Sequence, residues 1–162
     1  MTTPDRSPTV VPPGTGPGVF PPPGVTFPTS EIKLPTSAGA GFSVLEYRVP
    51  PRFSPPPSLH RQVNEDTAVY LLEGELHYWF EDGDTVATTG TLVHVPAGTW
   101  FRWSNERDDP ARLLCVFAPG GFEGFFLELG KAVADADWNP AALGGVIGPV
   151  RERYGDESYP GN

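Results

Sequence analysis

The chain has 162 residues, which is enough for one domain with a hydrophobic core and too few for two. A formal net charge of −9, with 11 Lys and Arg against 20 Asp and Glu, disfavours nucleic acids and anionic membrane surfaces as partners, because both are held chiefly by basic side chains. The single cysteine excludes an intrachain disulfide, and no basic start is followed by an apolar run, so a cytoplasmic protein without membrane contact is expected.

Residues 1–30 form a segment rich in Pro and Gly with almost no charge and no periodicity. Such a composition buries too little apolar area to offset the entropy of ordering the chain. The segment is expected to be disordered, or to be an arm that reaches a partner subunit, and a chain without it is expected to be equally stable. The anchors of such an arm would be Val19, Phe20, Val25 and Phe27.

From Phe42 onward the sequence changes to short β-rich runs, separated by turn residues about every ten positions. This pattern is typical of an antiparallel sandwich or barrel, and Asp82-Gly83 is a hairpin turn signal within it. Residues 31–118 are therefore expected to form a single mainly-β domain. The predicted strands are 42–49, 66–73, 75–81, 84–88, 91–95, 99–105 and 111–118.

A helical extension is predicted for residues 119–162. Its first part repeats large apolar residues at the spacing of one helical face, which we expect to pack on the barrel: Phe122, Phe125, Phe126 and Leu129. A second helix is predicted to start at Asn139-Pro140, a cap followed by a first-turn proline. Three glycines and Pro149 predict that this helix is broken or kinked.

Two segments, HRQVNEDTAVYLLEGE and GTLVHVPAGTWFRWSN, resemble the paired motifs of the cupin superfamily. The frame of the second motif matches at Gly90, Pro96, Gly98 and Asn105. The later segments PGGFEGFFLELG and RYGDE resemble the C-terminal extension of single-domain, quercetin-dioxygenase-like cupins from actinobacteria. The resemblance implies a cupin-type antiparallel β-barrel, or jelly roll, with a short C-terminal helical extension.

The resemblance also places the four metal-ligand positions of the family at His60, Gln62, Thr67 and Phe101. Three histidines and a glutamate are usual there, so one strong ligand remains. A neutral amide and a hydroxyl are weak donors to a first-row metal, and phenylalanine is none. The metal site is therefore expected to be degenerate, with neither a metal nor another cofactor bound.

The same positions are expected to line an apolar pocket, because strands alternate their faces and the ligand positions of the family point into the barrel. The expected substrate-binding residues are Gln62, Thr67, Val69, Leu71, Phe101, Trp103 and Asn105. His60 is the candidate catalytic residue, since a histidine exchanges protons near neutral pH. The alternative is that His60 is a former ligand that now hydrogen-bonds Gln62 or Thr67.

Three functions remain open at this point. The first is a metal-independent enzyme of specialised metabolism that cyclises, isomerises or dehydrates a small hydrophobic, polyketide-like or aromatic substrate. The second is a quercetinase-like dioxygenase with an atypical metal site, and the third is a non-catalytic protein that binds such a molecule. The barrel interior cannot hold all of five aromatic rings, so some are expected to face a partner subunit or the C-terminal helices: Trp79, Phe80, Trp100, Phe101 and Trp103. A homodimer is also expected.

Overall fold

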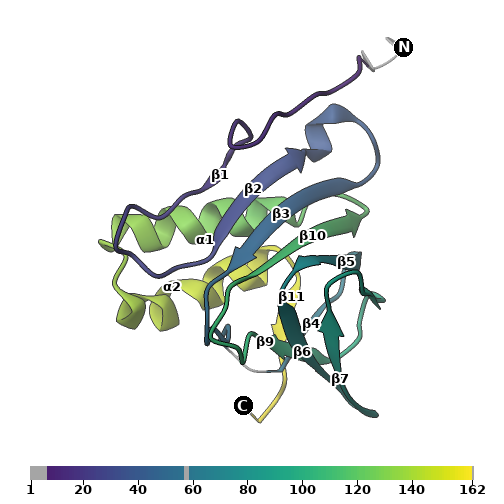
Figure 1. The fold of residues 1–162 in the computed structure, drawn as a ribbon, viewed down its shortest axis with the longest axis vertical. Helices are drawn as coiled ribbons and strands as arrows, with labels where there is room; N and C mark the ends of the chain where they lie inside the picture. The colour runs from purple at the N-terminus through teal and green to yellow at the C-terminus, as the bar shows by residue number, and fades with distance from the viewer. Residues whose placement is uncertain (1–6, 57–58, 162) are drawn as a thin grey trace.

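Two antiparallel sheets form the body of the protein in the computed structural model, which describes residues 7–56 and 59–161 (Figure 1). In spatial order, the first sheet consists of β1 (Gly18–Val19), β2 (Thr29–Leu34), β3 (Ser43–Val49), β10 (Ala111–Ala118), β5 (Asp66–Glu73) and β8 (Leu92–Val95). The second consists of β11 (Asp156–Ser158), β4 (His60–Gln62), β9 (Phe101–Ser104), β6 (Glu75–Phe80) and β7 (Gly83–Thr88). The expected mainly-β fold is confirmed, and every predicted strand ends within about two residues of the observed one.

The hydrophobic core follows from strict alternation along the strands. On β10, Ala111, Leu113, Cys115 and Phe117 are buried, while the residues between them are partly exposed. Successive side chains of a strand point to opposite faces of the sheet, so one face of β10 supplies the core. The turn at Asp82-Gly83 lies where it was expected, between β6 and β7.

Two helices follow the barrel, α1 (Glu123–Asp135) and α2 (Pro140–Arg153). The ring of Phe122 lies 5.2 Å from that of Phe117 on β10, which confirms that the apolar face of this region packs on the barrel. At the start of α2, Ala141 N–H donates to Asn139 Oδ1 at 3.0 Å, as predicted for a cap. The helix is continuous through Pro149, so the expected break does not occur. No helix in the described part of the chain is long and apolar enough to cross a bilayer.

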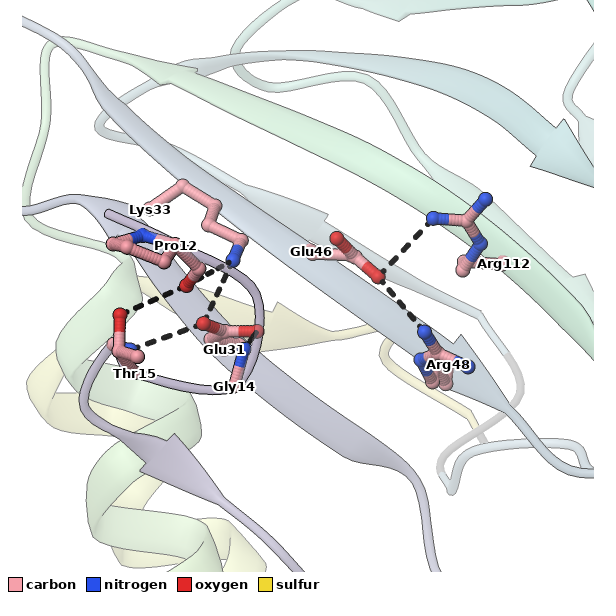
Figure 2. Close-up of polar contacts among 9 residues, drawn as sticks. Pro12, Gly14, Thr15, Glu31, Lys33, Glu46, Arg48 and Arg112 are labelled. Carbon is pink, nitrogen blue, oxygen red and sulfur yellow. Dashed lines mark hydrogen bonds and ion pairs between the residues drawn. The ribbon is translucent and has the colours of Figure 1, made fainter. Parts of the chain in front are cut away.

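The N-terminal segment packs against the first sheet of the same chain. β1 pairs with β2, with Val19 opposite Ser30, so the domain boundary expected at residue 30 falls inside β2. Glu31 on β2 accepts hydrogen bonds from the N–H group of Gly14 at 3.2 Å (Figure 2) and from that of Gly16 at 3.0 Å. Backbone pairing and a few buried side chains hold the segment, and neither leaves a periodic pattern in the sequence.

Glu31 also forms an ion pair with Lys33 at 2.7 Å (Figure 2). The hydrogen bond from Lys33, together with the two backbone donors, lowers the pKa of Glu31 to about 2. The carboxylate is therefore ionised under all ordinary conditions, and it fastens the N-terminal segment to the first sheet.

Candidate functional site

A pocket lies between the two helices, the N-terminal segment and one end of the barrel. About 750 Å³ between these elements is free of protein atoms, the open mouth included. The protein therefore has room for one small organic molecule at this place.

Aromatic rings form much of the wall. Tyr47 from β3 meets Phe126 from α1 at 5.2 Å and Trp103 from β9 at 6.1 Å, both edge to face. Phe53, in the loop after β3, lies 6.1 Å from Trp103. Edge-to-face packing fixes the rings relative to one another, so the wall has a defined shape before any ligand enters.

Polar groups gather at one side of the pocket. His60 and Gln62 come from β4, Arg151 from α2 and Asp156 from β11. β11 pairs with β4 so that Asp156 lies opposite Gln62, and Arg151 Nη2 donates to Asp156 Oδ1 at 2.9 Å. The side chains of Arg151 and Asp156 are 5% and 6% exposed, so this ion pair is buried.

A second carboxyl group lies near this ion pair. Glu65, in the loop between β4 and β5, is 5% exposed, and no described residue donates a hydrogen bond to its Oε1. Burial, reinforced by the charge of Asp156, raises the pKa of Glu65 to about 7. Burial also raises the pKa of Asp156 to about 6, because it outweighs the opposing effect of Arg151. Both carboxyl groups thus exchange protons near neutral pH.

Replacing Glu65 by Gln is expected to raise the free energy of unfolding by about 1–2 kcal/mol at about pH 7.5. The pKa of Glu65 is about 7 in the folded chain, against an ordinary 4.5, so between these values the folded protein keeps a proton that the unfolded chain has released. The free energy of unfolding of the wild type therefore falls as the pH rises through this window. The Gln variant does not show this fall, because its side chain carries no titrating proton. Urea unfolding from about pH 4.5 to 7.5 measures the difference. An equal gain at all pH values would contradict the prediction, and the exposed Glu81→Gln serves as the control.

Three of the predicted site residues line the pocket: His60, Gln62 and Trp103. Two more lie directly behind them. The ring of Phe101 packs on that of His60 at 4.4 Å, and the Thr67 hydroxyl donates to Gln62 Oε1. Phe101 and Thr67 therefore hold the pocket residues in place without lining the pocket themselves.

The remaining predicted site residues lie away from the pocket. Val69 and Leu71 are buried in the core between the sheets. The Asn105 amide donates to the carbonyls of Pro50 and Asp109, so it fastens two loops of the barrel. Strand alternation correctly predicted that these side chains point into the barrel. The barrel interior, however, is filled mostly by packed side chains, and the pocket lies outside that core.

Four site residues were not singled out from the sequence: Tyr47, Glu65, Arg151 and Asp156. Tyr47 lies on the predicted strand 42–49, whose sequence does not fix which of its side chains point inward. Asp156 belongs to the segment RYGDE, which carried part of the family resemblance but had no assigned role. No local sequence pattern marks Arg151 or Glu65 as a buried site residue, because a charged residue in a helix or loop is usually on the surface.

The two-sheet architecture and the motif frame point to one family. Residues 45–117 match the family model of the cupin domain. No curated protein matches the chain.

Three solved structures align with this chain, and the first two share its fold. The polyketide cyclase RemF from Streptomyces resistomycificus aligns with 69% of this chain and 80% of its own, at 21% identity and a TM-score of 0.57. Ectoine synthase from P. lautus aligns with 69% of this chain and 73% of its own, at 24% identity and a TM-score of 0.52. A sugar phosphate isomerase of the cupin superfamily from Silicibacter pomeroyi aligns with 56% of this chain and 59% of its own, at 25% identity and a TM-score of 0.48.

The four positions that correspond to the metal ligands of cupins do not fit a metal ion in this chain. The ring of Phe101 occupies one position against His60, and the Gln62 amide oxygen is engaged by Thr67. Within residues 7–56 and 59–161, no three His, Cys, Asp or Glu side chains group as a metal site. One imidazole with weak neutral donors is a poor set for a first-row metal, so we derive no chemistry from a bound ion.

Proposed function

We propose that this protein binds a small hydrophobic molecule in the pocket beside its cupin domain and transforms it by proton transfer, without a metal. The reaction class is isomerisation, cyclisation or dehydration. The observation that carries the proposal is the grouping of His60, Gln62, Arg151 and Asp156 at one side of a pocket whose other walls, apart from Ser30, are mostly aromatic and aliphatic. Such a pocket orients a ligand by its polar group and holds the rest by shape.

The polar residues have distinct roles in this proposal. The Asp156 carboxylate takes a proton from a carbon next to a carbonyl of the substrate, and the electron pair of that C–H bond moves into an enolate. Arg151 stabilises the enolate oxygen, which gains charge in a site shielded from water. His60, protonated at the start, donates its own proton to a second carbon, or to a hydroxyl group that leaves as water. After the product leaves, Asp156 releases its proton to solvent and His60 takes one up, which restores both groups. Gln62 holds the polar group in place.

Two further functions compete with this one. A quercetinase-like dioxygenase needs a metal centre, and the donors at the four ligand positions disfavour it. A binding protein without turnover would use the same pocket, so only a measured reaction separates it from an enzyme. The cupin fold is compatible with cyclisation, since RemF, with which this chain shares the fold, is a polyketide cyclase.

Deuterium exchange into a simple ketone tests the proposal. 2-Tetralone has a two-ring apolar body and acidic C–H groups beside its carbonyl. The chelator-treated protein is expected to accelerate exchange of these hydrogens with D2O, followed by NMR. General acid and base catalysis contributes about 10²–10⁴-fold, so Asp156→Asn and His60→Ala are each expected to lower the rate by at least about tenfold.

His94→Ala is the matched control, because His94 is exposed and pairs with Asp66 on the surface. Binding of 2-tetralone is measured separately by calorimetry. Binding without exchange would favour the binding protein over the enzyme. Absence of binding would contradict the proposed pocket, and exchange lost on chelation would restore the metal-dependent alternative.

A further inference from the structure

The pocket has an apolar end and a charged end, as the spacing of its residues on α2 indicates. Leu143, Ile147 and Arg151 all line it, and each is four residues from the next. Residues four apart lie one above the other on the same face of a helix. With a rise of about 1.5 Å per residue, the line from Leu143 to Arg151 is about 12 Å long. The wall changes along this line from aliphatic to charged.

α1 lies beside α2 and runs in the opposite direction. The Phe125 ring near its start lies 6.3 Å from the ring of Tyr154, which follows the end of α2, so the helices are antiparallel neighbours. The pocket residues Leu129 and Gly130, one turn further along α1, therefore lie toward the start of α2. The polar groups and the Leu143 end are at opposite ends of one elongated pocket.

The N-terminal segment closes the apolar end. The Val19 side chain is 7% exposed and rests directly on the backbone of Gly130, where an added Cβ would lie 2.7 Å from Val19 Cγ1. The ring of Phe27 meets that of Trp138, in the turn between the helices, at 5.6 Å. Val19 and Phe27 both line the pocket. Glu31, through its bonds to Gly14 and Gly16, holds the segment that carries Val19 (Figure 2).

We infer that the pocket takes an amphipathic molecule with one polar head and an unbranched or flat apolar body of about 12 Å, and that Val19 sets the greatest length of that body. The inference rests on the proposed function, since it assigns the substrate class of the same pocket. The head lies against Gln62, Arg151 and Asp156. The tail ends at Val19, whose side chain occupies the notch that Gly130 leaves in α1.

A series of 4-alkylphenols, with straight tails of about two to ten carbons, tests the inference by calorimetry. Affinity for the wild-type protein is expected to rise by about fourfold per methylene group and then to fall once the tail reaches Val19. Val19→Ala opens the notch, so the optimum is expected to move to a tail longer by about one or two carbons. Leu143→Ala, at the same end of the pocket, is expected to shift the optimum in the same direction.

Val10→Ala is the matched control, because Val10 belongs to the same segment and is 85% exposed, and its optimum should equal that of the wild type. An unchanged optimum in both Val19→Ala and Leu143→Ala would overturn the inference while the proposed function stands. So would a wild-type affinity that rises through the whole series without a maximum. Absence of any alkylphenol binding to the wild type would overturn the proposed function together with the inference.

Discussion

Replacing Arg151 by Met is expected to lower the free energy of unfolding by about 3–5 kcal/mol at about pH 7.5. The Arg151–Asp156 pair is buried at 2.9 Å, so loss of the guanidinium leaves the Asp156 carboxylate charged, buried and without its cation. This cost depends on the charge of Asp156, whose pKa is about 6 even with Arg151 present and rises further without it. At about pH 5 the carboxyl group is protonated and neutral, and the loss of stability is expected to be much smaller. Urea unfolding at the two pH values measures both effects.

Arg153→Met is the matched control, two residues further along α2. Arg153 pairs with Glu128 on the surface at 3.2 Å, and exposed pairs contribute about 1 kcal/mol or less. A similar loss in both variants, or a loss at Arg151 that does not depend on pH, would contradict a buried ion pair at the polar end of the pocket.

Deleting residues 1–28 is expected to lower the melting temperature by about 5–10 °C. The deletion removes the buried side chains of Val19 and Pro28, together with the pairing of β1 with β2. It also uncovers apolar side chains of α1 that line the pocket. The sequence predicted the opposite result, because its composition indicated a segment that makes few contacts.

Deleting only residues 1–10 is the control, since residues 7–10 are exposed, and the melting temperature is expected to stay within about 1–2 °C of that of the full chain. Calorimetry of the three chains decides the point. Equal melting temperatures for all three would show that the segment does not contribute to stability, as its composition alone suggests.

The sequence alone determined the barrel. Alternation of apolar residues and the turn glycines are local signals, so β3 and the strands from β5 to β10 were predicted almost to their ends. The motif frame identified the cupin resemblance, whose ligand positions placed His60 and Gln62 at the pocket, and strand parity added Trp103. These predictions succeed because each depends on neighbours within one strand or one turn.

Only the tertiary structure decided where the pocket lies and what lines it. β1, β2, β4 and β11 were not predicted, because they are short and are stabilised by partners far away in the chain. The pairing of β11 with β4 brings Asp156 beside Gln62, and α2 brings Arg151 to both, although about 90 residues separate these elements. Burial then shifts the pKa values of Glu65 and Asp156. Burial of a charge depends on packing from several elements at once, and no local pattern in the sequence encodes it.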